Sequence, residues 1–348
     1  MATRPATLPR PAAAPAPAPG RRLAGARRLL DQIRQAEGAP KRLLYAGAAI
    51  VALFVILAIF APLIAPYGFD QVESGGVRFA KQASPSGSHL FGTTVQSTDV
   101  LSRVIWGSRT AIEVVVLAVL FSIAIGVPLG LVSGYVGGKL DRVLVLINDA
   151  LFAFPYLLLA IVIAFLLSDK LGQGIVTAAV AITVVYIPQY FRVVRNHVIS
   201  VREEPYVEAA RALGAPRRTI IRRYVLSNVI QNVPPLATLN AADAVLTLAA
   251  LGFLGYGIQP TDAAEWGYDI NRAIDDVGAG IWWTGLFPGL AIVLLVTGFT
   301  LVGEGLNDVL NPLIRKRRIR KPEIPDQREA PAQVAEAAVV PSERELKA

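Results

Sequence analysis

The sequence predicts an all-α membrane protein in which six apolar helices cross the bilayer as a packed bundle. Of the 348 residues, 53% are hydrophobic and only 17% are charged, whereas about a quarter of the residues of a soluble domain are charged. The apolar residues also gather in stretches of about 20, the length that a helix needs to cross about 30 Å of hydrocarbon. Because lipid offers backbone groups no partner, these spans must be helical.

Six stretches have this character, and the first of them lacks the small-residue cleavage site of a signal peptide, so it is expected to remain as an anchor. The fourth stretch is the shortest. In chain order the predicted spans are residues 43–65, 111–136, 144–167, 175–191, 225–254 and 286–306.

The segments outside the spans define the remaining organisation. An Ala-, Pro- and Arg-rich leader at residues 1–42 is expected to be disordered, because it cannot bury a core. Residues 66–110 are expected to form an extracytoplasmic segment. Residues 111–310 form the core domain, with a long loop at 192–224, and residues 311–348 form a basic tail.

The basic residues predict the orientation. Of the 34 Lys and Arg residues, 28 lie in the leader, the loop after the second span, the 192–224 loop and the tail, and six lie in the alternate segments. Cytoplasmic loops carry the excess of Lys and Arg, so both termini are expected in the cytoplasm of a bacterium, with the chain in the inner membrane. The positive net charge is thereby explained by topology and by contact with anionic lipid, and no nucleic-acid partner is expected.

Composition also excludes several chemistries. The chain has no cysteine and two distant histidines, so disulfides, thiolate metal sites and a cysteine nucleophile are excluded, and no metal site is expected. An intramembrane aspartyl protease would need two membrane carboxylates. Asp149 and Asp243 are the only candidate pair, and neither has the Gly-x-Gly-Asp context of that class.

The loop at 192–224 contains a short patterned helix. Glu203 and Glu204 favour a helix start, and Pro205 suits the first turn. Gly214 can cap the end, and Pro216 prevents continuation. A second helix is expected from about residue 219 into the fifth span. A helix of about two turns does not persist alone in water, so it is expected to dock on a partner.

Several motifs resemble those of a known family. Glu208-Ala209-Ala210, followed by Gly214, resembles the EAA loop of ABC importer permeases, which docks on the ATPase subunit. The wider resemblance, over about residues 43–313, is to the C-type permease of dipeptide/oligopeptide importers, a six-span bundle of the type I importer permease kind. It rests on His89-Leu-Phe-Gly-Thr, Asp99-Val-Leu-Ser-Arg103, Gly126-Val-Pro-Leu-Gly130, Phe253-Leu-Gly-Tyr-Gly257, Phe287-Pro-Gly-Leu-Ala291 and Gly305-Leu-Asn-Asp.

This resemblance implies a transport subunit that couples a pathway to separate ATPases. The chain has no phosphate-binding G-x-x-x-x-G-K-[ST] motif, so no cofactor and no enzyme activity are expected on it, and ATP and Mg²⁺ would be used by the partner subunits. The implied partners are a homologous second permease, two cytoplasmic ATPases and an extracytoplasmic substrate-binding protein. The residues expected to contact the ATPase are Tyr206, Glu208, Ala209, Ala210, Leu213 and Gly214.

The fifth predicted span carries a polar stripe. Asn232, Asn240, Asp243 and Thr247 recur at spacings that bring them near one helical face. Charged groups at membrane depth face cavities or partners. Two interpretations stand about equal: the stripe lines the translocation path, with Asp243 meeting a peptide's amino group, or it hydrogen-bonds to the second permease.

The loop before the last span is acidic and rich in tryptophan. Tryptophan is typical of membrane interfaces, and the resemblance adds a receiving surface for the binding protein, to which Asp262, Glu265, Trp266 and Asp269 are assigned. Peptides are the expected cargo. Nickel or short oligosaccharides are alternatives within the family, and an ion-gradient-driven secondary transporter is the alternative from another class.

Overall fold

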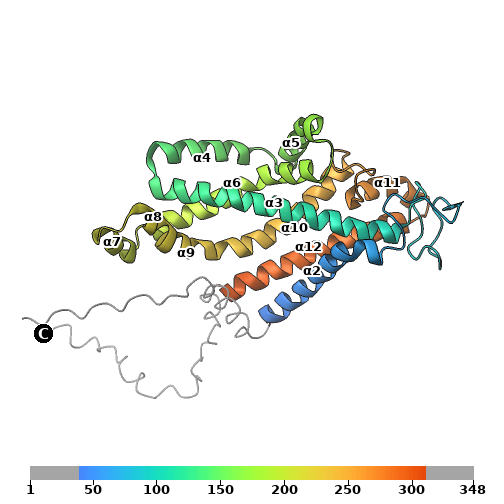
Figure 1. The fold of residues 1–348 in the computed structure, drawn as a ribbon, viewed down its shortest axis with the longest axis horizontal. Helices are drawn as coiled ribbons and strands as arrows, with labels where there is room; N and C mark the ends of the chain where they lie inside the picture. Colours follow the sequence, from blue (N-terminus) through green and yellow to red (C-terminus); the bar gives the residue numbers. More distant parts are fainter. Residues whose placement is uncertain (1–38, 311–348) are drawn as a thin grey trace, which may run out of the picture. The chain divides into compact units, whose positions relative to one another are not determined.

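The structure is a computed structural model that describes residues 39–310, and the side chains of 41–309. Its helices include the long α2, α3, α6, α10 and α12, which run through one bundle, with α7 at one end and α11 at the other (Figure 1). The helical elements are α2 (Ala39–Ile64), α3 (Val100–Val136), α4 (Gly138–Ala153), α5 (Tyr156–Leu171), α6 (Ile175–Val201), α7 (Pro205–Ala212), α8 (Arg217–Thr219), the π-helix η1 (Ile220–Val225), α9 (Leu226–Val229), the 3-10 helix η2 (Ile230–Asn232), α10 (Val233–Phe253), α11 (Trp266–Gly278) and α12 (Trp283–Leu310).

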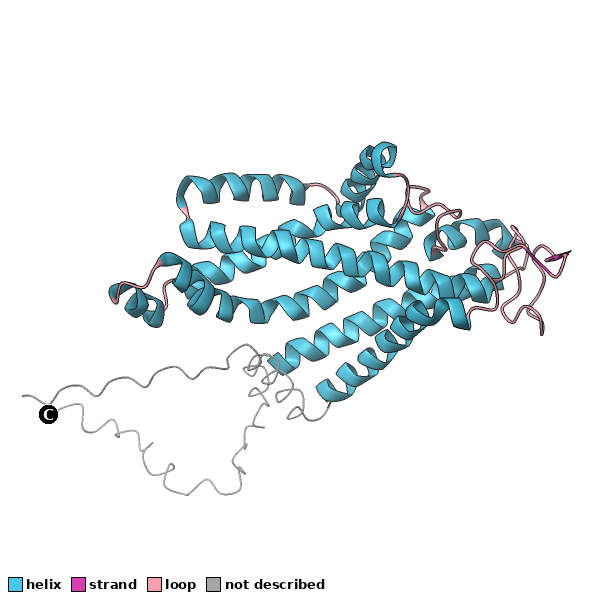
Figure 2. Ribbon diagram, in the orientation of Figure 1, coloured by secondary structure: helices cyan, strands magenta, loops and turns pink. Residues whose placement is uncertain are grey.

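Strand structure among the described residues is confined to one small hairpin. Strand β1 (Glu73–Ser74) pairs antiparallel with β2 (Val77–Arg78), with Glu73 opposite Arg78. The hairpin lies in the long segment between α2 and α3, at the same end of the bundle as α11 (Figure 2). The all-α prediction is confirmed for this part of the chain.

Five helical segments of the described residues are long and apolar enough to cross a membrane, and a sixth span results if α4 and α5 count as one. The predicted third span, 144–167, is wrong as a single helix, because α4 and α5 meet at an angle of 98°. Pro155 is the physical reason. A residue before proline avoids the α region, and Phe154 is accordingly extended, with φ −75° and ψ 140°.

Three other boundaries differ from the sequence prediction. Helix α3 begins at Val100 and not at residue 111, because the Asp99 carboxylate caps it by accepting a hydrogen bond from the Ser102 amide. Helix α6 continues to Val201, ten residues beyond the predicted end. Helix α2 begins at Ala39, so the last residues of the predicted leader are helical. The rest of the leader and the tail lie outside the described residues.

The bundle is held together by close helix crossings. Along α3, Gly126, Gly130 and Gly134 recur every fourth residue and face α6, where an added Cβ would lie 2.7, 2.6 and 2.8 Å from the nearest atoms of that helix. Small residues at this spacing let helix backbones approach closely, and van der Waals packing then drives association in lipid. The same arrangement joins α2 and α12, where Gly47 lies against the backbone at Gly298.

The entry to the fifth predicted span is irregular in its helical hydrogen bonding. The π-helix η1 and the 3-10 helix η2 precede α10, and Pro234 and Pro235 occupy the first turn of α10. Prolines are tolerated there because the first amides of a helix have no internal partner. The helical segments from α8 to α10 nevertheless follow one another as a single candidate span, Arg217–Phe253.

Candidate functional site

Helix α7 forms where the sequence predicts a short helix in the 192–224 loop. Glu204 is the extended N-cap residue, Pro205 occupies the first turn, and Gly214 follows the end with a φ of +77°. This positive φ is costly for residues with a Cβ, so glycine suits the position. The helix lies at the tip of the bundle, where the chain turns back from α6 toward α10 (Figure 1).

One face of α7 is anchored and the other is open. Val207 and Ala210 are buried, and the Ala215 amide donates to the Ala210 carbonyl at 3.0 Å, which closes the helix end. The Tyr206 hydroxyl accepts a hydrogen bond of 2.9 Å from the Asn228 amide on α9. Leu213 is 88% exposed. Of the six expected ATPase-contact residues, only Ala210 packs inward. The other five are exposed: Tyr206, Glu208, Ala209, Leu213 and Gly214.

An ion pair fixes the end of α6 that leads into α7. The Arg195 guanidinium donates to both carboxylate oxygens of Asp141, at 2.6 and 2.8 Å. Ser133 also donates to Asp141, and Arg202 donates to the Gly134 carbonyl at 3.0 Å. Bidentate pairs of this kind fix orientation as well as adding energy. These contacts tie the α3–α4 turn to the end of α6 that precedes α7.

The structure divides the predicted polar stripe. Asn240 and Thr247 are buried within the chain, and the Thr247 hydroxyl lies 3.2 Å from that of Tyr186 on α6. Asn232 and Asp243 are exposed. Asn240, Asp243 and Thr247 are three and four residues apart on α10, so these three lie near one helical face. Asn232 lies outside α10, in η2, and Asp243 differs from Asn240 and Thr247 in being exposed. Of these four residues, Asp243 lines a cavity beside the α4–α5 turn.

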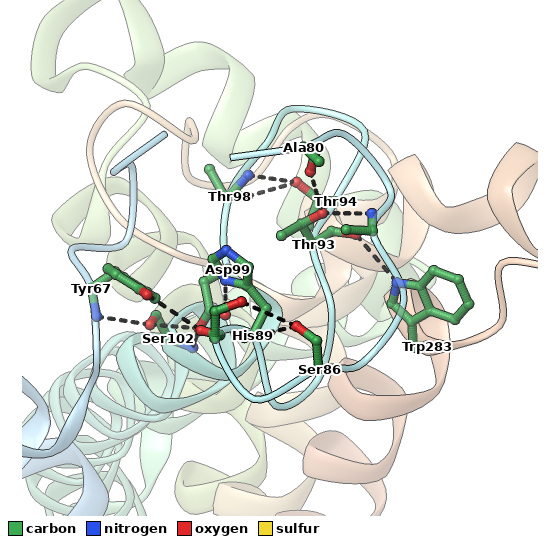
Figure 3. Close-up of polar contacts among 12 residues, drawn as sticks. Tyr67, Ala80, Ser86, His89, Thr93, Thr94, Thr98, Asp99, Ser102 and Trp283 are labelled. Carbon is green, nitrogen blue, oxygen red and sulfur yellow. Dashed lines mark hydrogen bonds and ion pairs between the residues drawn. The ribbon is translucent and has the colours of Figure 1, made fainter. Parts of the chain in front are cut away.

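The segment before α3 is ordered by buried polar contacts. His89 Nδ1 lies 2.9 Å from Asp99 Oδ1, and Asp99 Oδ2 accepts from the Ser102 amide and hydroxyl at 2.8 Å (Figure 3). The Trp283 indole donates to the Thr93 carbonyl at 3.3 Å, which joins this segment to α12 (Figure 3). The motif residues at 89–99 therefore have a structural role that the sequence alone did not reveal.

A buried ion pair joins α3 to α11. The Arg103 side chain is 2% exposed, and its Nε donates to Asp269 Oδ1 at 2.7 Å. Arg103 Nη1 also donates to the Phe69 carbonyl, at 2.9 Å. Burial raises the pKa of Asp269 above its ordinary value, and Arg103 opposes that rise. Removing either partner would leave the other charge buried and unpaired.

Glu265 caps the N-terminus of α11. Its carboxylate accepts from the amides of Gly267 and Tyr268 at 2.8 and 2.7 Å. Burial raises the pKa of Glu265 to about 8, although these two donors favour the charged form.

The assignment of binding-protein contacts is corrected by burial. Glu265, Trp266 and Asp269 are 3%, 3% and 7% exposed, so in this conformation none of them offers a surface to a soluble partner. The Trp266 indole instead donates to the Val104 carbonyl at 3.2 Å. Asp262 alone of the four is exposed. A sequence pattern reports charge and spacing, but it does not reveal which acidic residues turn inward as caps and ion-pair partners.

The fold defines a class: a multi-pass α-helical membrane protein whose spans pack through small residues and whose 192–224 loop carries a short, partly exposed helix. The chain belongs to the family of binding-protein-dependent transport system inner membrane components, whose sequence profile matches residues 126–316. The N-terminal transmembrane domain of oligopeptide transport permease C matches residues 41–82. The protein is accordingly a permease subunit of an ABC importer.

Curated relatives cover most of the chain. The dipeptide transport system permease protein DppC of Alkalihalophilus pseudofirmus is 36% identical over 79% of this chain and 87% of its own length. The glutathione transport system permease proteins GsiD of Pectobacterium atrosepticum and Escherichia coli are 33% and 35% identical, over 78% and 77% of this chain and 87% and 86% of theirs. A solved structure of the MetNI methionine ABC transporter, inward facing, is similar with a TM-score of 0.49 and 23% identity, over 61% of this chain and 96% of that one.

Proposed function

We propose that this chain forms half of the translocation pathway of an importer for short peptides. Its relatives are named as dipeptide and glutathione permeases, and its N-terminal segment matches an oligopeptide permease domain, which supports peptide cargo. The other half of the pathway is a homologous permease, so the working unit is a heterodimer with two ATPases below it and a binding protein above it.

The orientation follows from charge. Of the 34 Lys and Arg residues, 28 lie in the leader, the loop after the second span, the 192–224 loop and the tail, and the positive-inside rule assigns such segments to the cytoplasm. Both termini then face the cytoplasm of a bacterial cell, and α11 with exposed Asp262 faces the binding protein.

The exposed tip of α7 is the observation that carries the coupling proposal. A helix of about two turns that presents Tyr206 and Leu213 to solvent leaves apolar surface for a partner to cover. Because Val207 and Ala210 anchor its other face, a push on α7 displaces the helices to which it is attached. Docked ATPases that approach one another on binding ATP and Mg²⁺ would swing the bundle as a rigid body between inward- and outward-open states.

Asp243 and Asn232 contribute this chain's share of the pathway lining, and Asn240 and Thr247 support it from inside the bundle. The exposed carboxylate of Asp243 suits a cationic cargo group, and an intramembrane acid is expected to face a cavity or a partner. Replacing Asp243 with Ala is expected to reduce peptide uptake while assembly with the partner subunits persists.

The test measures uptake of a labelled dipeptide by cells that express the complete transporter. Uptake is expected to stop when ATP is depleted and to continue when a protonophore collapses ion gradients at constant ATP. The reverse result would identify an ion-gradient-driven secondary transporter. Uptake of nickel or short oligosaccharides in place of dipeptides, under the same ATP dependence, would uphold the importer and refute the peptide cargo.

A further inference from the structure

A cavity lies at the elbow where α4 turns into α5. Its volume is about 400 Å³, and it is lined by residues of the elbow, of α6 and of α10. The 98° bend between α4 and α5 lies beside it, and Phe154 and Pro155 of that bend are among its lining residues. The volume falls within the range of pockets that hold small molecules.

The cavity has one charged group. Asp243 is the only carboxylate among its lining residues, and no Lys or Arg lines it. Among residues 39–310, no side-chain or backbone donor contacts the Asp243 carboxylate, although the Asp243 carbonyl accepts from Thr247 at 2.8 Å. A carboxylate at membrane depth is costly without a counter-charge. The lining therefore holds a carboxylate without a counter-charge, and a cationic ligand could supply that charge.

Aromatic rings form much of the remaining wall. Phe152, Phe154, Tyr156 and Tyr186 all line the cavity, and ring faces attract cations. The Phe152 ring already binds a cation in this way, because the Arg192 guanidinium carbon lies 3.9 Å from the centroid of that ring. That guanidinium also pairs with Asp149 at 2.9 Å, so its charge is balanced and does not compete for Asp243.

We propose that the elbow cavity binds a primary ammonium group of the cargo, with Asp243 as its charge partner and the aromatic rings as its walls. This inference rests on the proposed function and names the chemistry of its pathway: the free N-terminal amine of a short peptide. Gln189, the amide among the lining residues, offers a hydrogen-bonding group beside that amine.

This chain has no native cysteine, so a single cysteine introduced into it can be followed on this subunit within the assembled transporter. Gln189→Cys places one thiol in the cavity. Its modification rate is measured with a cationic and an anionic methanethiosulfonate, and the ratio is normalised to that of mercaptoethanol. A cleft of single-sign charge raises local counter-ion concentration by about tenfold or more, so we expect the ratio to favour the cationic reagent by at least about tenfold. The Asp243→Asn substitution is expected to bring this ratio of cationic to anionic modification rates near one. Asp169→Asn, an exposed acid at the far end of α5, is the matched control and should leave it unchanged.

A second arm uses alanyl-alanine and its N-acetyl derivative as probes. The free dipeptide is expected to slow modification of the Gln189→Cys thiol, and the acetylated one is not. Equal protection by both, a charge ratio insensitive to Asp243→Asn, or a thiol that neither reagent reaches would overturn the ammonium site. If ATP-dependent dipeptide uptake is intact, any of these results would refute the ammonium site and leave the proposed function standing. Absence of dipeptide uptake would refute the proposed function itself.

Discussion

Truncating Leu213 is the sharpest test of α7 as the contact with the ATPase. The side chain is 88% exposed, so Leu213→Ala removes almost no packing from the permease. Exposed substitutions of this kind change stability by about 0.5 kcal/mol or less. In the assembly, by contrast, a leucine buried in a groove of the ATPase contributes about 1.5 to 3 kcal/mol. Each 1.4 kcal/mol corresponds to a tenfold change in Kd, so affinity for the ATPase is expected to fall by about ten- to a hundredfold.

The assay titrates purified ATPase onto the permease heterodimer in lipid nanodiscs and measures Kd, while a thermal melt of the permease alone measures Tm. Leu90→Ala is the matched control, because Leu90 is 62% exposed and lies at the opposite end of the bundle. It should leave both the Kd and the Tm unchanged. An unaltered Kd for Leu213→Ala would refute α7 as the docking helix, and a fall of several degrees in its Tm would show that Leu213 supports the fold instead.

Three further predictions concern the fold that positions the site. Gly130→Val would bring a Cβ within 2.6 Å of a carbonyl of α6, and overpacking of about 1 to 3 kcal/mol or more should lower the Tm, whereas Gly289→Ala, with nothing within 4 Å, should not. Burial raises the pKa of Glu265 to about 8 from 4.5, so between these pH values the folded protein keeps a proton that the unfolded chain loses. The free energy of unfolding should therefore fall as the pH rises from 4.5 to 8, by about 1.4 kcal/mol per pH unit. Melts of Glu265→Gln across this range should have a flatter pH dependence, and an unchanged slope would contradict the argument. Asp141→Asn leaves the Arg195 guanidinium with a weaker acceptor and should cost about 2 kcal/mol and weaken ATP-coupled uptake more than ATPase binding. Equal loss of both would argue against a role in transmission.

Patterns that depend only on neighbours in the chain predicted much of the structure. Apolar stretches located the spans because the thickness of the hydrocarbon fixes the required length. The α7 boundaries followed from Glu204, Pro205 and Gly214, since helix starts and ends are set by local backbone geometry.

Long-range contacts decided the rest. Whether an acidic side chain is exposed or buried depends on what packs over it. Sequence spacing therefore could not show that Glu265 and Asp269 are buried while Asp262 is exposed. The 98° elbow was missed because hydropathy averages over a window and is indifferent to a proline within it. The missed elbow also hid the cavity beside Asp243.

The amino-acid sequence by itself determined that the chain crosses the membrane, which family it resembles and where the short helix α7 begins and ends, because length, charge and caps are local properties. Only the tertiary structure decided which face of α7 is open, which polar groups of α10 are buried and where a cavity forms. These features depend on the close approach of helices distant in sequence, and that approach is set by packing.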